Sequence, residues 1–477
     1  MGVLPLTGET EPDKQLLGGK AFSLVQMLRL GINVPPAFCI TTDECQRYHD
    51  GGGEIPADVL RALPGAMQHL EEITGRTFTK DLLVSVRSGA PQSMPGMMDT
   101  VLNLGVVSNP AHPYPADDIP SRFEEMYSKV VGGEPPEDPW EQLHGAIAAV
   151  FGSWKSKRAI AYRKNRGLPE EGGTAVTIQA MVFGNADPEK SGTGVLFTRN
   201  PLTGAPEPFG EWLAGGQGED VVSGSHDPEP LSALESSFPE LHAELMESAH
   251  KLEQDGRDMM DIEFTVESGR LWLLQARSGK RSPAAAIRLA VLLQQEGIIS
   301  EGEALDRITP DQAKAVMKEH VDPDARASAT VLATGKAACP GLAKGVIVTD
   351  VDEAEERAED GESVILARPV TTPDDMHAMA VVSGIITAVG GATSHAAVVS
   401  RELGVACVVG AGNTITELEG REVTLDADAG ELLDGHVKTV ETTEEDDPDL
   451  AQLSEWARAE NGAAAGADLP TLLAARG

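Results

Sequence analysis

The segment Gly390 to Arg401 places a histidine where a predicted strand gives way to a predicted helix. Ile385 to Val389 is a short apolar run typical of a strand, two glycines follow it, and Ala396 to Leu403 has a helical pattern. His395 therefore falls in the first helical turn. Free backbone N–H groups and the positive end of the helix dipole disfavour an imidazolium there and favour an attached anion. The placement predicts a neutral imidazole that can carry a phosphoryl group.

The type of residue alone leaves another interpretation open, because a single histidine is more often a core or capping residue. The neighbours favour catalysis: Gly390 and Gly391 remove bulk around the ring, while Thr393 and Ser394 add hydroxyl donors. Either hydroxyl could also cap the helix. We take His395, Thr393 and Ser394 as candidate catalytic residues.

A second group of motifs near the N-terminus predicts a phosphate site. Gly18-Gly19-Lys20 precedes the amphipathic stretch Ala21 to Leu30, so glycines and a lysine stand at a helix entrance. The motif is weak evidence, because the Gly-x-x-x-x-Gly-Lys-Ser/Thr spacing of a P-loop is absent. A stronger signal is the predicted strand Leu82 to Ala90, which carries Arg87, with the glycine-rich loop Ser93 to Thr100 after it. A guanidinium beside free loop amides suits a polyphosphate, although an ordinary Gly/Pro turn is the alternative.

A predicted hairpin supplies oxygen ligands. Asp261 to Val266 and Leu271 to Arg277 alternate with period two, and a turn at residues 267–270 separates them. The alternation gathers acidic side chains on one face of the first strand, and an amide and a guanidinium on one face of the second. Such a surface suits Mg-ATP, because a hard cation prefers oxygen and phosphate prefers a cation. A half-exposed hairpin with solvated charges is the alternative.

These motifs resemble the phosphoenolpyruvate-utilising enzymes, a family that includes pyruvate phosphate dikinase, phosphoenolpyruvate synthase and rifampin phosphotransferase. Thr393-Ser394-His395 and the segment Ser85 to Gly105 are most similar to the dikinase. The resemblance runs from about Lys14 to Gly435 and implies an ATP-grasp-type fold for the first part. It does not include the barrel that binds pyruvate or phosphoenolpyruvate in the dikinase, so no residue is assigned to pyruvate.

The resemblance also implies roles for individual residues. His395 would be the nucleophile, and Arg87, Arg277 and Lys20 would hold the charge that develops on the phosphates. Glu263 and Gln275 would be the Mg²⁺ ligands. The residues expected to contact the nucleotide are Lys20, Arg87, Gly96, Met98, Asp99, Thr100, Arg122, Thr198, Arg199, Asp261, Glu263, Gln275 and Arg277.

Composition narrows the class of protein. The chain has 75 acidic against 38 basic residues, which argues against a nucleic-acid or anionic-membrane partner. Its four cysteines form no Cys-x-x-Cys pair, so neither a disulfide framework nor a zinc site is expected. No apolar run approaches the ~20 residues that cross a bilayer. We expect a soluble cytoplasmic protein.

With 477 residues the chain should contain several domains of α/β and α+β class. We expect an ATP-grasp-type nucleotide-binding domain at residues 1–280 and a helical connector at 281–333. A swivelling phosphohistidine α/β domain would follow at 334–436. Residues 437–477 are acidic and Ala/Gly-rich, so we expect a solvated, partly disordered tail with a short helix at Leu450 to Ala459.

The expected function is an ATP-dependent phosphotransferase. His395 would take the β-phosphate of ATP with inorganic phosphate as co-substrate, giving AMP and pyrophosphate, and would pass the phosphoryl group to an acceptor. A separate barrel subunit as acceptor would make the chain part of a split dikinase. The alternatives are a small-molecule phosphotransferase, in which phosphate or water takes the γ-phosphate, and a regulatory phosphocarrier. Family precedent weakly favours a homodimer.

Overall fold

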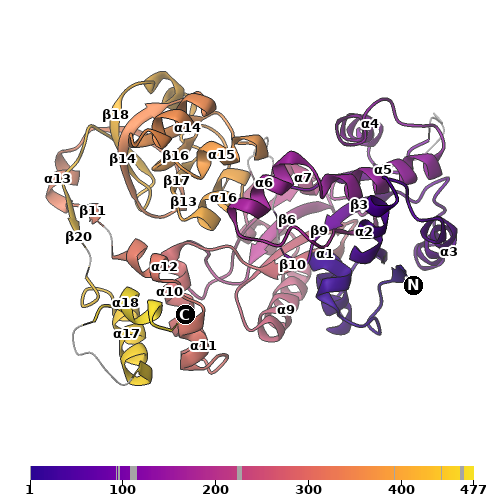
Figure 1. Cartoon of the computed structure of the whole chain (residues 1–477), viewed down its shortest axis with the longest axis horizontal. Coiled ribbons are helices and arrows are strands. Elements are labelled where there is room, and N and C mark those ends of the chain that lie inside the picture. The colour runs from indigo at the N-terminus through magenta and orange to yellow at the C-terminus, as the bar shows by residue number, and fades with distance from the viewer. Residues whose placement is uncertain are drawn as a thin grey trace. The chain divides into compact units, whose positions relative to one another are not determined.

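The computed structural model describes residues 2–92, 94, 97–107, 115–187, 189–222, 228–317, 319–391, 393–441, 443–461 and 467–476. Within these residues helices and strands are mixed, and the strands form sheets of five, five, two and eight strands (Figure 1). The first compact unit comprises Met1–Thr193, Ala214–Gln217 and Glu263–Arg277, and the rest of the chain forms the second. The expected multidomain α/β class is confirmed at this level.

The first unit is built on an antiparallel sheet in the order β1-β2-β5-β3-β4. Every residue of its central strand β5 is buried, including the polar residues Thr177 and Gln179. The strands are β1 (Val3–Pro5), β2 (Ala37–Ile40), β3 (Val84–Gly89), β4 (Thr100–Leu104) and β5 (Ala175–Ala180). The helices are α1 (Lys14–Arg29), α2 (Thr42–Asp50), α3 (Ala57–Thr74), α4 (Ile119–Val130), α5 (Pro139–Ser153) and α6 (Lys157–Asn165).

The second sheet has the order β10-β9-β6-β7-β8. Its strands are β6 (Gly192–Phe197), β7 (Phe209–Ala214), β8 (Glu229–Pro230), β9 (Met260–Glu267) and β10 (Arg270–Ser278), and the helices near them in sequence are α7 (Gly218–Val222), α8 (Leu231–Ser237) and α9 (Pro239–Gly256). The expected hairpin is present as β9 and β10. Ser268 and Gly269 turn the chain with φ of 49° and 80°, the positive values that a tight two-residue hairpin turn requires. Both faces of β9 are largely buried, whereas β10 is only partly buried.

The carrier domain, which we define as residues 319–441, contains the eight-stranded sheet β12-β19-β18-β14-β15-β16-β17-β13. Strands β14 to β17 are parallel, and apolar clusters cover both faces of the sheet. The strands are β12 (Val331–Thr334), β13 (Lys336–Cys339), β14 (Leu342–Val348), β15 (Val364–Arg368), β16 (Gly384–Thr387), β17 (Ala406–Val409), β18 (Glu422–Asp426) and β19 (Glu431–Asp434). The helices are α13 (Pro323–Ser328), α14 (Val351–Glu359), η1 (Pro373–Asp375), α15 (Met376–Met379), α16 (His395–Leu403) and η2 (Asn413–Leu418).

The connector is helical over α10 (Pro283–Gln295), α11 (Glu301–Asp306) and α12 (Pro310–Val316). The stretch from residue 319 to 333, expected to continue it, instead contains the short strand β11 (Glu319–Val321), helix α13 and the start of β12. Strand β11 pairs with β20 (Thr439–Glu441), which is the last strand of the carrier domain.

The C-terminal segment corrects one expectation. Its helix is present as α17 (Pro448–Asn461), and α18 (Leu469–Ala474) follows, but each buries an apolar face. Leu450, Leu453 and Trp456 recur on one helical face and are buried with α18 against α10, α11 and α12. The acidic and Ala/Gly-rich average composition hides this apolar face, and the segment is a packed part of the fold.

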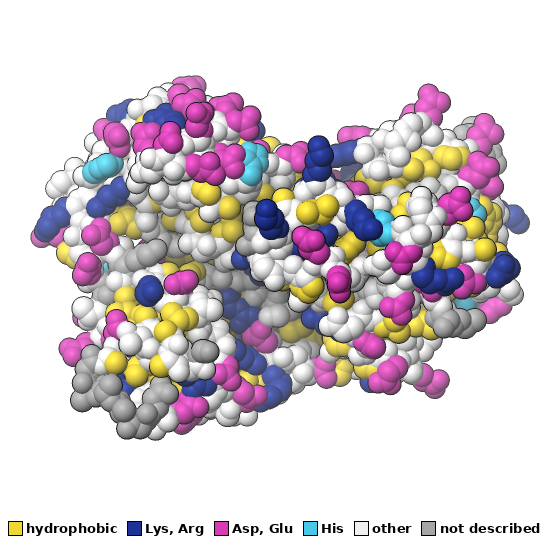
Figure 2. All heavy atoms as spheres, viewed as in Figure 1, with side chains coloured by type: hydrophobic (Ala, Val, Ile, Leu, Met, Phe, Trp, Pro, Cys, Tyr) yellow, Lys and Arg dark blue, Asp and Glu magenta, His cyan; other side chains and the backbone are white. Residues whose placement is uncertain are grey.

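Across the described residues no helix has the length and apolarity to cross a membrane. The acidic residues are spread over the visible surface and do not gather in one patch (Figure 2).

Replacing Leu453 with Ala should destabilise the α17 region by about 2–5 kcal/mol, because it removes fully buried methyl groups from this cluster. The matched control, Glu455→Ala, alters an exposed residue of the same helix and should change stability by less than about 0.5 kcal/mol. Hydrogen exchange of the α17 and α12 amides measures the change in stability in each of the two variants. Unchanged protection in Leu453→Ala would show that α17 does not depend on this packing.

Candidate functional site

The glycines before Lys20 allow α1 to approach the end of β3. Gly18 has φ 69°, and a Cβ atom there would lie 1.7 Å from the carbonyl oxygen of Gly89, so no other residue fits. The Gly19 amide donates to the Ala90 carbonyl at 2.8 Å. Gly18 forms a kink inside α1, and these contacts fasten the kink to the strand that carries Arg87, which places Lys20 within the electrostatic reach of Arg87.

Arg87 joins β3 to the β9–β10 hairpin. Its Nη2 lies 3.2 Å from Gln275 Oε1 and 3.5 Å from Glu263 Oε2, and its Nη1 lies 3.5 Å from the Leu274 carbonyl. The two expected metal ligands therefore meet at one guanidinium. Thr100 is the cross-strand partner of Arg87.

The pKa of Lys20 reflects its burial and the charges of the residues around it. Burial is the largest cause that lowers the pKa of Lys20, and together with the nearby cations Arg87 and Arg277 it brings this pKa to about 7, while Glu263 opposes the shift. Positive charge thus exceeds negative charge at a buried place. An anionic ligand would relieve the excess.

The remaining candidates of the first unit have other partners. Asp99 forms an ion pair with Arg158, and its backbone amide contacts Ser153 Oγ at 3.3 Å. Arg122 donates to Asp118 at 2.5 Å within α4. Met98 is half-buried next to Asp99, and Gly96 lies outside the described residues. Contact of these residues with a nucleotide stays a prediction.

Thr198 and Arg199, in the second unit, face carboxylates. Thr198 Oγ1 donates to Glu253 at 2.5 Å, and Arg199 donates to both Glu253 and Glu296 with shortest distances of 2.7 and 2.6 Å. A phosphate at Arg199 would compete with two carboxylates. Asp261 is buried on β9, and its charge acts on Arg401 of the carrier domain.

His395 is the first residue of α16, as expected. Burial lowers the pKa of His395 below its ordinary value, and the Asp375 carboxylate only partly opposes this. The ring is therefore neutral at pH 7. Its Nδ1 lies 3.2 Å from Thr371 Oγ1, so this hydroxyl can fix the tautomer of the ring.

The residues before His395 shape a small polar surface. Ser394 occupies the N-cap position, yet within the described structure its buried Oγ has no hydrogen-bond partner. Thr393 donates to the Glu211 carboxylate of β7. A Cβ atom at Gly391 would lie 2.6 Å from Glu211 Oε1, so the glycine permits this approach. An unpaired buried hydroxyl at a helix start is well suited to an anion.

Sequence reasoning missed Thr371 and Glu211. Thr371 follows β15 and His395 follows the adjacent parallel strand β16, so both loops lie at the carboxyl edge of the sheet. The proximity of Thr371 to His395 could be predicted only from the order of the strands in the sheet. Glu211 precedes Trp212 in a strand with no distinctive motif, and no local signal marks it.

Comparison with known proteins gives the family. The profile described as pyruvate phosphate dikinase, AMP/ATP-binding domain matches residues 51–241, and the one described as PEP-utilising enzyme, mobile domain matches residues 360–430. The chain is 38% identical to a pyruvate, phosphate dikinase of Rhizobium meliloti over 94% of its length. It belongs to the pyruvate phosphate dikinase family. The resemblance inferred from the motifs is thus confirmed.

Other relatives extend the match. A pyruvate, phosphate dikinase of Clostridium symbiosum is 39% identical over 90% of the chain, and a chloroplastic one of Arabidopsis thaliana is 37% identical over 94%. The chain spans 58%, 57% and 53% of the three relatives respectively, little more than half of each. The activity of a whole dikinase therefore cannot be transferred directly to this chain.

ATP binding should take up a proton at Lys20. The pKa of Lys20 is about 7 without ligand, and phosphates should raise it, so near pH 8 binding converts a mostly neutral amine to ammonium. Affinity should fall as pH rises above 7. Calorimetry in buffers of different ionisation enthalpy should give roughly one proton per ATP at pH 8.

The matched control is Lys20→Arg, which keeps a cation that does not titrate in this range. Binding by this variant should show no proton uptake and a flatter dependence on pH. Proton uptake that is equal in both proteins would place the titrating group elsewhere.

Thr371→Val should disturb the tautomer of His395 and slow phosphorylation of the ring by about tenfold, the effect of one lost hydrogen bond. Thr371→Ser keeps the hydroxyl and should restore both the tautomer of His395 and the rate of its phosphorylation. Nitrogen-15 NMR of the imidazole reports the tautomer, and quenched-flow labelling reports the rate. A normal tautomer in Thr371→Val would exclude a positioning role.

Proposed function

We propose that this chain catalyses the ATP half-reaction of a dikinase: phosphorylation of His395 by the β-phosphate of ATP, with inorganic phosphate as co-substrate. The neutral His395 ring at the start of α16 carries this proposal. An unprotonated imidazole nitrogen is a nucleophile, and the helix start stabilises the anion formed on it. The family match of residues 51–241 to an AMP/ATP-binding domain supports the donor.

The proposed reaction consists of two displacements, one at the β-phosphorus and one at the γ-phosphorus of ATP. The Nε2 lone pair of His395 attacks the β-phosphorus in line, and the bond from that phosphorus to the oxygen it shares with the α-phosphorus breaks, so AMP leaves. Inorganic phosphate then attacks the γ-phosphorus and leaves as pyrophosphate, with the β-phosphoryl group retained on His395. With Nδ1–H donating to Thr371, Nε2 holds the free lone pair.

The nucleotide-binding residues supply charge. We assign Lys20, Arg87 and Arg277 to the phosphates, since their positive charges crowd one buried place. ATP would enter an ATP-grasp-type site there.

Magnesium fits the oxygens present. Glu263 and Gln275 offer one carboxylate and one amide oxygen around Arg87, a hard donor set. Among the described residues no group of three or more acidic, His or Cys side chains forms a metal site. Two protein oxygens nevertheless suit Mg²⁺, which usually keeps several waters and phosphate oxygens. The ion would offset phosphate charge.

The acceptor of the phosphoryl group defines the role of the chain. A separate barrel protein acting on pyruvate would make this chain part of a split dikinase in the cytoplasm. A small-molecule acceptor would make it a specialised phosphotransferase. Ser394, with its unpaired hydroxyl, would bind the phosphoryl group in either case.

The test is to incubate the chain with Mg²⁺ and ATP labelled at the β or the γ position, with and without inorganic phosphate. We expect acid-labile β label on the protein and release of pyrophosphate that depends on phosphate. His395→Ala should abolish the label. His377→Ala changes a partly exposed histidine of the same domain and should leave labelling intact.

The outcomes separate the alternatives. Label from the β-phosphate without a requirement for phosphate, and with orthophosphate released, would indicate that water takes the γ-phosphate. Label from the γ-phosphate, or label retained in His395→Ala, would contradict the proposal.

A further inference from the structure

A short basic segment interrupts this acidic chain. Six of the twelve residues from Lys155 to Arg166 are Lys or Arg and none is acidic, whereas acidic residues outnumber basic ones by 75 to 38 in the whole chain. The segment contains helix α6 and lies wholly within the first compact unit. We call residues 155–166 the basic segment. Its sign is opposite to that of the net charge, which repels anions.

Three lysines of the basic segment have no carboxylate partner. Lys155, Lys157 and Lys164 are exposed, and none of them forms an ion pair with any residue that the structure describes. Lys157 and Lys164 are seven residues apart, so they share one face of α6. Their positive charges are therefore free to act on a solute.

Arg163 adds a buried positive charge to the segment. It is 2% exposed, and its Nε and Nη1 have no hydrogen-bond partner in the described part of the chain. Its guanidinium lies over the ring of Trp154, 4.0 Å from the centroid. Burial lowers the pKa of Arg163, and the charge of Glu170 partly opposes this, but an arginine stays protonated at neutral pH. Water screens this charge less than it screens an exposed one.

The positions of these cations do not favour the helix itself. Lys157 and Arg158 stand in the first turn of α6, and no acidic residue is present there. The positive end of the helix dipole disfavours cations at this end. Residues that break a local preference without a gain in stability are typical of functional positions.

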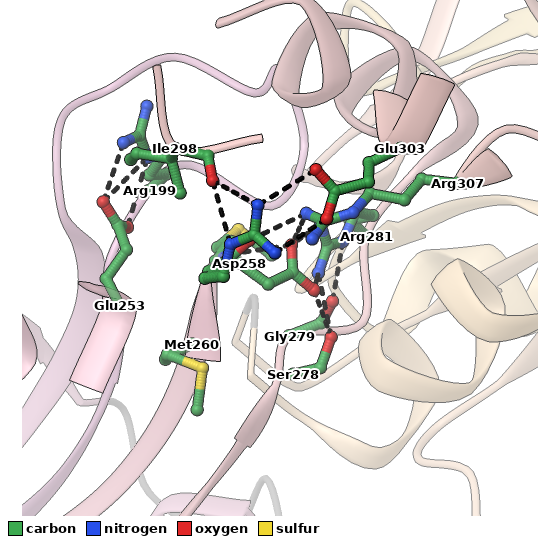
Figure 3. Close-up of polar contacts among 12 residues, drawn as sticks. Arg199, Glu253, Asp258, Met260, Ser278, Gly279, Arg281, Ile298, Glu303 and Arg307 are labelled. Carbon is green, nitrogen blue, oxygen red and sulfur yellow. Dashed lines mark hydrogen bonds and ion pairs between the residues drawn. The ribbon is translucent and has the colours of Figure 1, made fainter. Parts of the chain in front are cut away.

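A group of arginines in the second unit has the opposite character. Asp258 accepts two hydrogen bonds from Arg281, at 2.7 and 2.8 Å, and Glu303 accepts one from Arg257 at 2.7 Å (Figure 3). Arg307 lies 3.6 Å from Asp258. Carboxylates thus compensate the arginines that fasten the fold, whereas the three lysines of the basic segment lack such partners.

The basic segment adjoins the glycine-rich loop of the candidate site. Arg158 forms an ion pair with Asp99, and its Nε donates to the Met97 carbonyl at 3.2 Å. The loop leads into Thr100, which is the cross-strand partner of Arg87. The cations of α6 therefore stand beside the loop that runs to the strand pair carrying Arg87.

We propose that the basic segment steers ATP toward the candidate site by its electrostatic field. A chain with a formal net charge of −37 repels a polyphosphate at long range, and unpaired cations beside the loop offset this repulsion. The three lysines act on the encounter and do not contact the bound nucleotide. This inference rests on the proposed function, because it takes ATP as the ligand.

The test is stopped-flow binding of N-methylanthraniloyl-ATP with Mg²⁺ to the full chain and to two triple variants. The steering variant carries Lys155→Gln, Lys157→Gln and Lys164→Gln. The matched control carries three changes at exposed lysines on other elements: Lys80→Gln, Lys129→Gln and Lys336→Gln. Each triple removes three positive charges, so only their place differs. Gln has nearly the helix propensity of Lys, and circular dichroism verifies the fold.

At about 20 mM ionic strength the steering variant should bind with an association rate constant about fourfold below that of the wild type. The control should differ from the wild type by less than about 1.5-fold, because its charges lie away from the loop. At about 0.5 M salt the difference should vanish, since the Debye length is then about 4 Å. The dissociation rate constant should stay within about twofold in both variants.

Three results would overturn the inference. One is an unchanged association rate constant in the steering variant at low salt. The second is an equal loss in the control, which would mean that net charge matters and its place does not. The third is faster dissociation with unchanged association, which would make the lysines ligands of the bound nucleotide.

The same experiment separates this inference from the proposed function. Nucleotide binding by the wild type without any label on His395 would contradict the proposed phosphorylation, while the association rate constants would still decide on steering. A wild-type chain that does not bind the nucleotide would contradict both.

Discussion

A neutral imidazole in the first turn of α16 is the constraint on which the carrier domain depends. The helix start and partial burial both oppose an imidazolium, so the ring of His395 is unprotonated before any ligand arrives. The parallel strands β15 and β16 set this geometry, because their carboxyl ends bring Thr371 and the start of α16 to one edge of the sheet. Gly390, with φ 130°, lets the chain turn there beside the side chain of Ser394.

The first unit gathers positive charge around Lys20. Lys20, Arg87 and Arg277 lie near the Glu263 carboxylate, and burial, followed by the charge of Arg87, lowers the pKa of Lys20. A site in this state binds a polyanion by relieving repulsion already present. The first unit thus gathers cations around Glu263, and the carrier domain holds an unprotonated imidazole.

Sequence patterns predicted the features that depend on neighbouring residues. The start of α16 and the β9–β10 hairpin follow from glycine spacing and period-two alternation. The patterns could not predict Thr371 beside His395 or Glu211 beside Thr393. The second pair is separated by 182 residues, and only the strand order brings its members together. The helix α17 was predicted, but its packing was not, because the average composition of the segment conceals three apolar residues on one face of the helix.

Charge balance distinguishes Arg87 from Arg199, both of which sequence reasoning assigned to the nucleotide. Arg87 shares its surroundings with two other cations and one carboxylate, so an arriving phosphate meets net attraction. Arg199 faces two carboxylates at 2.6 and 2.7 Å, and a phosphate would first have to displace one of them. A guanidinium compensated in this way serves better as a fastening than as a ligand. The motif Thr-Arg-Asn-Pro gives the same residue types to either role, and only the partners that the fold brings to Arg199 favour the structural one.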